Sequence, residues 1–371
     1  MPSYPHLRRP RLHLRALAAL LLGLAARSAT AHEPPIGTSM AVVSAAIKEG
    51  KVVVYAATDA EVIAPLLADF ASVYPRISVE YHDLNTRELN DRYLDEVASG
   101  TPAADVLWSP AMDLQMKLAN DGYAQIYESP EAAGIAPWAV WRNEAFGTTL
   151  EPFVFIHDRR VLPSGAVPQS HAELARWLDE NRDDVRGRVG TYNPERSAIG
   201  YLLLTQDSRI DPAFGENLRS YARAGLALHG TVSKMIEQVR SGAELLAFNV
   251  NGSYALRAAR HHPELAVVYP KDYVLAASRI ALITKTAPHP AAARVFLDYI
   301  LSHRGQEALA SRCGLFSIRT DVPGDNTAAV LAKQLGARLK PIHVGPSLLV
   351  FLDGSKRADF IRRWRDAPAA R

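Results

Sequence analysis

The sequence has almost no cysteine: among its 371 residues only Cys313 carries a thiol. A single thiol excludes a disulfide scaffold, an iron–sulfur protein and a structural zinc site built on several thiolates. A lone cysteine most simply behaves as a small buried hydrophobic residue. We therefore expect a structural thiol at this position and not a nucleophile, since no neighbouring motif supplies a base.

The sequence also lacks a large excess of charge. Apolar residues make up 48% and charged residues 22% of the chain, which excludes wholesale disorder and a polytopic membrane protein. The formal net charge is +3, but residues 1–31 hold five arginines and no acid; without them 37 basic residues face 39 acidic ones, a net charge of −2. The basic surface typical of nucleic-acid-binding proteins is therefore absent, and no partner of that kind is expected.

Common catalytic motifs are missing as well. The sequence has no G-x-S-x-G elbow, no phosphate-binding P-loop, no G-x-G-x-x-G after a strand and no H-E-x-x-H. The adjacent pair His261 and His262 precedes Pro263 in a charged stretch, and neighbouring helical side chains point about 100° apart, so we read the pair as solvated surface. These observations predict a protein that is not an enzyme and has no cofactor and no metal centre.

Residues 1–31 have the three parts of a signal peptide: arginines first, then the apolar run 16–26, then Ala29-Thr30-Ala31. Eleven apolar residues are too few to cross a bilayer, which needs about 20, and no later segment is long and apolar enough to do so. The only cysteine is far from the cleavage point, so lipid attachment is not expected. The sequence thus predicts a soluble periplasmic protein that is neither a lipoprotein nor embedded in the membrane.

The rest of the chain alternates strands and helices, with three βα units first, which predicts an α/β protein with parallel, doubly wound sheets in two lobes. Expected strands are Lys51–Tyr55, Ile77–Tyr81, Asp105–Trp108, Phe153–His157, Arg188–Tyr192, Glu244–Phe248, Leu265–Tyr269 and Arg279–Lys285. Expected helices lie around Val42–Lys48, over Ile63–Phe70, between Asn85 and Gly100, between Ser109 and Gly122, from Ser197, at Val232–Arg240 and at Pro290–Ser302, with a partly helical tail beyond Thr320.

Several helix starts have recognisable signals. Thr58 and Glu61 have capping-box spacing, and Asn85 and Glu88 have the same spacing with asparagine as the cap. Ser109 followed by proline predicts an N-cap with proline at the first helical position. Pro65 inside an apolar helical pattern predicts either a kink or a later helix start.

Polar residues gather where the predicted strands end, and ligands of open α/β sheets bind beyond the carboxyl ends of the strands. We therefore expect a ligand site formed by these side chains. They are Thr58, Asp59, Ser109, Arg196, Ser197, Asn251, Ser253 and Tyr254.

The turn that contains Arg196 and Ser197 is the most informative of these places. A guanidinium, a hydroxyl and the free N–H groups of a helix start suit a phosphate or carboxylate. The alternative is that Ser197 only caps the helix and that Arg196 is a surface side chain. The sequence alone leaves both interpretations open.

The chain resembles the extracellular solute-binding proteins of ABC importers, in the broad group that includes ferric-iron-binding proteins. The resemblance covers about residues 50–320 and rests on the order of several segments, not on one motif. These segments are Val52–Tyr55, Ile63–Phe70, Ala104–Trp108, Arg196–Gly200, Phe248–Tyr254, the tract from Ala287 to Gln306, and Gly314–Phe316.

This resemblance implies a type 2 clamshell, usually monomeric, that closes on a ligand and delivers it to a membrane permease. It implies lobe one at 42–150 plus 276–314 and lobe two at 152–273 plus 315–371, with the hinge near Glu151–Pro152 and Tyr273–Ser278 and the tail mainly on lobe two.

The sequence departs from the iron-binding members. The resemblance places Ser253 and Tyr254 where those proteins have two adjacent tyrosines. It places Ala57-Thr58-Asp59 after the first strand, where they have a histidine, and Ser109-Pro110 after the third, where they have a carboxylate. A hard trivalent cation would find few anionic oxygens, so we expect a small phosphorylated or carboxylated metabolite instead. Arg196→Ala should then weaken binding by about ten- to a hundredfold. Ferric iron as cargo, a sensor that docks a membrane signalling kinase, and an enzyme with Cys313 in the cleft are the alternatives.

Overall fold

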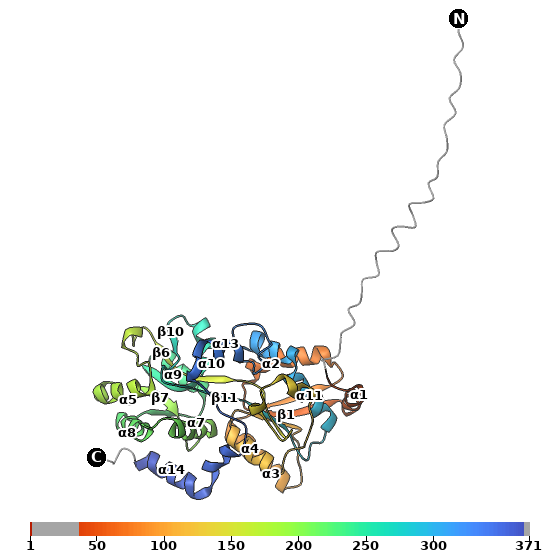
Figure 1. Cartoon of the computed structure of the whole chain (residues 1–371), viewed down its shortest axis with the longest axis horizontal. Coiled ribbons are helices and arrows are strands. Elements are labelled where there is room, and N and C mark those ends of the chain that lie inside the picture. Colours follow the sequence, from red (N-terminus) through yellow and green to blue (C-terminus); the bar gives the residue numbers. More distant parts are fainter. Residues whose placement is uncertain (2–36, 367–371) are drawn as a thin grey trace. The chain divides into compact units, whose positions relative to one another are not determined.

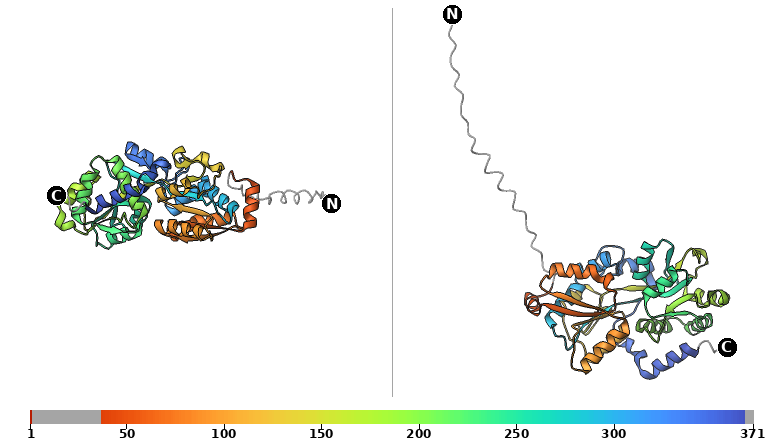
Figure 2. Two further views of the ribbon diagram at one scale, coloured as in Figure 1. Left: turned by 90° about the horizontal axis from the view of Figure 1, so that it is seen from below. Right: turned by 180° about the vertical axis from the view of Figure 1, so that it is seen from behind.

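The fold is built from two mixed β-sheets, each covered by helices (Figures 1 and 2). The computed structural model describes Met1 and residues 37–366, so the predicted signal peptide lies outside the continuous described range. Residues 37–366 belong to one compact unit. Within residues 37–366 no helix is long and apolar enough to span a membrane. The prediction of an α/β fold is confirmed, and the sheets are mixed, not purely parallel.

Sheet one has the strand order β2-β1-β3-β12-β5-β4. Its first three strands pair in parallel, as the three βα units predict, whereas β12 runs antiparallel to β3. The strands are β1 (Lys51–Ala56), β2 (Ser78–Asp83), β3 (Val106–Ser109), β4 (Val140–Trp141), β5 (Ala145–Gly147) and β12 (Ile280–Ile283). The helices of this half are α1 (Met40–Glu49), α2 (Ala60–Val73), α3 (Thr86–Ala98), α4 (Met112–Asn120), α11 (Pro290–Leu301) and α12 (His303–Ala308).

Sheet two has the order β13-β11-β6-β9-β7-β8, with β10 also paired to β6. Its long central strand, β6, is buried along its whole length, as expected for a strand covered on both faces. The strands are β6 (Glu151–Asp158), β7 (Val189–Tyr192), β8 (Ala227–His229), β9 (Leu246–Asn251), β10 (Leu265–Val268), β11 (Val274–Ala277) and β13 (Leu339–Pro341). The helices are α5 (His171–Glu180), α6 (Arg182–Val185), α7 (Ala198–Ile210), α8 (Phe214–Ala224), α9 (Val232–Arg240) and α10 (Gly252–His261).

The chain crosses between the sheets at residues 148–150 and returns at residues 278–279. The two crossings are bonded to each other: the Thr148 N–H donates to the Arg279 carbonyl at 2.9 Å, and the Arg279 N–H donates to Thr149 Oγ1 at 3.0 Å. The predicted lobe boundary at residue 276 falls inside β11, which pairs with strands of sheet two.

Two predicted helix starts are wrong. Helix α2 begins at Ala60 after Asp59, and Thr58 does not cap it, because its hydroxyl accepts a hydrogen bond from Arg279 far along the chain. Helix α4 begins at Met112, since Ser109 is still the last residue of β3 and its Oγ accepts from the Ala111 N–H at 3.2 Å.

Other local predictions can also be compared with the structure. The Asn85 cap is confirmed, with its Oδ1 accepting from two backbone N–H groups of α3 at 2.9 and 3.1 Å. Pro65 lies inside α2, so the later helix start does not occur. Cys313 is buried, and burial raises the pKa of its thiol to about 11, as expected for an unreactive structural residue.

The C-terminal segment contacts both halves. It contains α13 (Ala328–Leu335), η6 (Pro346–Leu352) and α14 (Gly354–Asp366). Phe360 of α14 packs on Tyr201 and Leu204 of α7, while η6 contacts α4 and the Val344 N–H donates to the Trp138 carbonyl at 2.9 Å. The segment therefore does not belong to sheet two alone.

Asp113 in α4 gives this half of the fold a pH-dependent stability. Its side chain is 3% exposed, and burial raises its pKa to about 6, although the Leu114 N–H and the charges of Arg357 and Arg87 act the other way. The folded state binds the proton of Asp113 more tightly than the unfolded state does. The free energy of unfolding therefore falls as the pH rises from about 4 to 6 and this carboxyl loses its proton. The full cost is about 3 kcal/mol, at ~1.4 kcal/mol per pKa unit.

Asp113→Asn mimics the neutral carboxyl and should remove this cost. The free energy of unfolding of the variant, relative to that of the original protein, should therefore rise by up to about 3 kcal/mol between pH 3.5 and pH 7. Urea unfolding at both pH values measures the difference. A difference that stays constant with pH would show that Asp113 does not titrate in this way.

Candidate ligand-binding site

A cavity of ≈ 180 Å³ lies between the strand ends of the two sheets. This volume is well above the ~10–15 Å³ that one water needs, so the cavity can hold a small ligand. Its lining comes from both sheets and from the return crossing: Ala57, Asp59, Asp83, Leu84, Asn85, Thr86 and Pro110 from the first half, Phe153, Tyr192, Ile199, Gly230, Thr231, Val232, Ser233, Asn251 and Tyr254 from the second, and Arg279.

Several helices begin at this cavity. Asp59, Asn85, Thr231 and Asn251 are the N-cap residues of α2, α3, α9 and α10, and Ile199 lies in the first turn of α7. The first N–H groups of a helix have no partner within the helix and carry partial positive charge. The convergence of helix starts from both sheets therefore favours a negatively charged ligand group.

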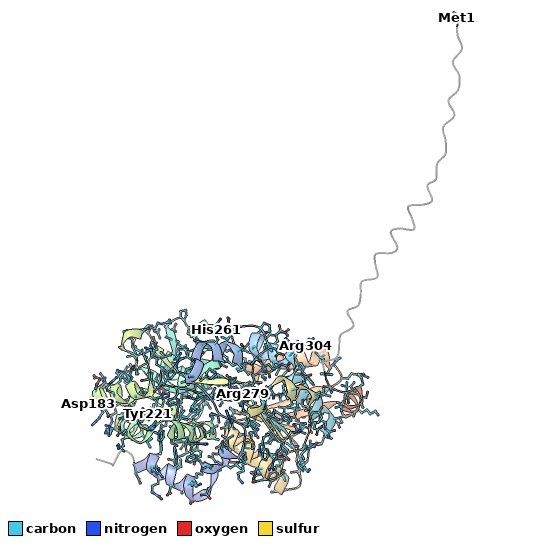
Figure 3. All side chains as sticks on the ribbon, viewed as in Figure 1. Met1, Asp183, Tyr221, His261, Arg279 and Arg304 are labelled. Carbon is cyan, nitrogen blue, oxygen red and sulfur yellow. The ribbon has the colours of Figure 1, made fainter. Side chains whose placement is uncertain are left out.

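Arg279 brings a buried guanidinium to the cavity (Figure 3). The residue is 2% exposed; its Nη1 lies 2.6 Å from Glu151 Oε1, and its Nε donates to Thr58 Oγ1 at 2.8 Å. Burial alone would lower the pKa of Arg279, but the charge of Glu151 raises it. Arg279 is thus held as a cation between the end of β1 and the start of β6.

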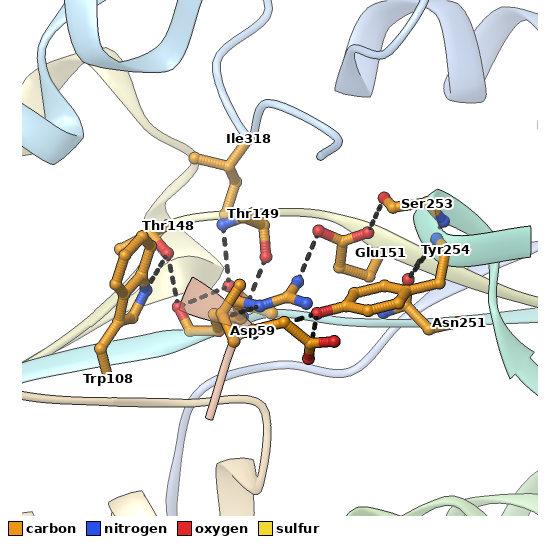
Figure 4. Close-up of polar contacts among 12 residues, drawn as sticks. Asp59, Trp108, Thr148, Thr149, Glu151, Asn251, Ser253, Tyr254 and Ile318 are labelled. Carbon is orange, nitrogen blue, oxygen red and sulfur yellow. Dashed lines mark hydrogen bonds and ion pairs between the residues drawn. The ribbon is translucent and has the colours of Figure 1, made fainter. Parts of the chain in front are cut away.

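Glu151 links this guanidinium to α10, because its second carboxylate oxygen accepts a hydrogen bond from the Ser253 hydroxyl (Figure 4). Burial raises the pKa of Glu151, while Arg279 and Ser253 favour the charged form. Gly252 lets α10 begin this close to the crossing, since a Cβ there would lie 2.9 Å from the Pro152 carbonyl oxygen. Thr58, Arg279, Glu151 and Ser253 form one polar chain from sheet one to sheet two.

Asp59 makes a second polar connection between the two halves. Its Oδ1 accepts from the Tyr254 hydroxyl at 2.9 Å (Figure 4). Its Oδ2 accepts from the Ser233 hydroxyl at 3.2 Å. Burial raises the pKa of Tyr254, so the phenol keeps its proton and donates a hydrogen bond to the Asp59 carboxylate. These hydrogen bonds join the start of α2 to the starts of α9 and α10 beside the cavity.

The structure brings together some of the residues that the sequence suggested. Asp59, Asn251 and Tyr254 line the cavity, although the Asn251 side chain also caps α10 by accepting from the N–H groups of the next helical residues. Thr58 and Ser253 are buried directly behind it as partners of Arg279 and Glu151.

The remaining suggested residues do not line the cavity. Ser109 is buried at the end of β3, and its neighbour Pro110 reaches the lining instead. Ser197 caps α7 by accepting from the Gly200 N–H at 3.3 Å, and Arg196 is exposed. In this structure Ser197 is therefore a helix cap and Arg196 a surface side chain, which was the second of the two interpretations that the sequence left open.

Sequence reasoning missed the residues at the centre of the polar chain. Arg279 is the one charged residue in the stretch Val274–Ile283, and a single residue, Pro152, separates Glu151 from the apolar run Phe153–Ile156. An isolated charge in such a stretch is a signal for a buried ion pair, but the two partners are 128 residues apart and only the sheet topology brings them together. Thr231 was also missed, although it directly precedes a correctly predicted helix.

Residues 37–366 contain no cluster of three or more histidine, cysteine, aspartate or glutamate side chains that could hold a metal ion. Tyr254 and Tyr192 both line the cavity, and burial raises the pKa of each phenol.

The chain is similar in sequence and in fold to known solute-binding proteins. The family described as "Bacterial extracellular solute-binding protein" matches residues 65–334. The substrate-binding protein of an ABC transporter from Agrobacterium tumefaciens is 36% identical, with a TM-score of 0.82, and the match covers 86% of this chain and 94% of that one. No protein with a curated description matches.

More distant solved structures share the fold. Iron-bound HitA from Pseudomonas aeruginosa is 18% identical over 85% of this chain and 99% of its own, with a TM-score of 0.66. AfuA from Actinobacillus pleuropneumoniae, with fructose-6-phosphate bound, is 18% identical over 87% of this chain and 100% of its own, with a TM-score of 0.70.

These matches confirm the predicted two-lobed solute-binding fold and the prediction that the chain is not an enzyme. The cavity then lies where the two lobes meet. The chain belongs to the family of bacterial extracellular solute-binding proteins.

Proposed function

We propose that this protein is the periplasmic receptor of an ABC importer and that it binds a small organic solute with an anionic group in the cavity between its lobes. The observation that supports this proposal is the convergence of helix starts from both halves on a cavity that also contains a buried guanidinium. Helix N-termini and arginine both bind phosphate and carboxylate groups, the first through free N–H groups and the second through a planar, charged fork of donors. Closure would follow when the ligand contacts both lobes.

In this proposal Arg279 holds the anionic group together with the first turn of α9. Its Nε and Nη1 are used by Thr58 and Glu151, and the guanidinium lines the cavity beside Tyr254. Arg196 does not line the cavity, so the effect of Arg196→Ala on affinity should be small compared with that of a change at Arg279.

A thermal-shift screen of refolded, ligand-free protein lacking residues 1–31 tests the proposal. The panel contains sugar phosphates, phosphoglycerates, dicarboxylates, phosphonates and ferric citrate. A ligand at 100 times its Kd adds about 2.7 kcal/mol of stability, which should raise the Tm by about 5 °C in a protein of this size. A shift with an organic anion supports the proposal, whereas a shift with ferric iron alone, or no shift at all, contradicts it.

A further inference from the structure

The charges around the cavity do not suit an anion alone. Two carboxylates, Asp59 and Asp83, line it, and its one lining guanidinium, Arg279, is already matched by Glu151 at 2.6 Å. These four groups carry a formal net charge of −2. The helix starts attract negative charge locally, but a purely anionic ligand would also lie against two carboxylates with no cation between them.

We infer that the ligand is zwitterionic: besides its anionic group it carries an ammonium group that Asp59 and Asp83 bind. This inference rests on the proposed function, which supplies the anionic group of the ligand, and it adds the ammonium group. Asp83 is exposed and Asp59 half-buried in this structure, and both would lose water when a ligand fills the cavity. A charged oxygen that loses water needs a partner of opposite charge, which the ammonium group would provide.

The two carboxylates belong to the same corner of sheet one. Strands β1 and β2 are neighbours, with Ala56 paired to Asp83, and Asp59 follows three residues after Ala56. The Ala60 N–H, at the start of α2, donates to Asp83 Oδ2 at 2.9 Å. The starts of α7 and α9, which come from sheet two and suit the anionic group, line the same cavity, and α9 also contacts this corner directly through the Ser233 hydroxyl on Asp59.

Both carboxylates still have acceptor capacity. Each oxygen of Asp59 accepts one hydroxyl, from Tyr254 or Ser233, and a carboxylate oxygen has two lone pairs. Asp83 Oδ1 accepts no hydrogen bond from any of residues 37–366. The aromatic rings of Phe153 and Tyr192 also line the cavity, and aromatic faces favour a neighbouring ammonium group.

Matched pairs of compounds test this inference by isothermal titration. Phosphoethanolamine and propyl phosphate differ in one ammonium group, and γ-aminobutyrate and pentanoate differ in the same way. In at least one pair the ammonium compound should bind about 10–100-fold more tightly, the usual contribution of a charged hydrogen bond. Propylamine, which lacks the anionic group, should bind far more weakly than either zwitterion.

Substitutions of the two aspartates test whether their carboxylates contact the ammonium group. Asp59→Asn and Asp83→Asn should each reduce the preference for the ammonium compound by about tenfold while binding of the neutral-tailed anion stays the same or improves. Asp91→Asn is the matched control, because Asp91 is an exposed aspartate on α3 that does not line the cavity. It should leave the preference unchanged.

The outcomes separate the inference from the proposed function. If each anion binds as tightly as its ammonium partner, the ligand is a simple anion, so the inference falls and the proposed function stands. If propylamine binds as tightly as the zwitterions, the site is a cation site and the proposed function falls as well. If neither pair binds, or if Asp91→Asn removes the preference as strongly as the cavity variants, the inference is overturned.

Discussion

Arg279→Met should destabilise the folded protein by about 3–5 kcal/mol, because it leaves the buried charge of Glu151 without its partner. Glu151 is 1% exposed, and within residues 37–366 its only cationic contact at hydrogen-bond distance is the guanidinium of Arg279, 2.6 Å away. Urea unfolding measures the loss. Glu151→Met should show a loss of the same order, since it leaves the guanidinium unpaired in turn.

The double variant Arg279→Met with Glu151→Met is the control for this prediction. When both charges are removed, apolar side chains of similar size can fill the space, so most of the lost stability should return. A double-mutant cycle then gives the coupling between the two residues. Losses that simply add in the double variant would contradict the claim that the two side chains form one buried pair.

Trp108→Ala should cost a similar amount, about 3–5 kcal/mol, because it empties the largest fully buried side-chain position in the fold. Trp108 lies on the central strand β3, with its ring 6.5 Å from that of Phe296 on α11. Its Nε1 donates to Thr148 Oγ1 at 2.8 Å, and that hydroxyl donates to the Arg279 carbonyl at 2.8 Å (Figure 4). The indole therefore also supports the crossing that carries Arg279.

Trp108→Phe separates these two contributions. It keeps most of the ring volume but loses the hydrogen bond to Thr148, so it should cost clearly less than the alanine variant, as measured by the same urea unfolding. Equal losses for the two variants would mean that the hydrogen bond, and not the packing of the ring, accounts for the stability.

Local sequence patterns predicted much of the fold. Helix α9 begins and ends where its pattern does, and the first three strands pair in parallel as expected. The predictions failed where a distant residue decides the local structure. Thr58 has the spacing of a helix cap, but Arg279, 221 residues away, takes its hydroxyl. Strand β12 has the same composition as a parallel strand, and only the topology makes it antiparallel.

The candidate site was predictable only in part, for the same reason. Asp59, Asn251 and Tyr254 follow strands and line the cavity, because strand ends of both sheets meet there. Arg279 lies in one crossing between the sheets and Glu151 begins β6 directly after the other. A crossing has no pattern of its own in the sequence. The Arg196 turn has the residue types of an anion site, yet its side chain is exposed outside the cavity.

The central claim is that the cavity between the lobes is where the ligand binds, and blocking the cavity tests it most directly. Gly230 lines the cavity, and a Cβ placed there meets nothing within 4 Å, so a larger side chain can enter without strain. Gly215 on α8 also has open space around it and does not line the cavity, which makes it the matched control. The measurement is the affinity of the anion with the largest thermal shift for Gly230→Leu and for Gly215→Leu. The account predicts at least about a tenfold loss in the first variant and none in the second, and equal affinities would contradict it.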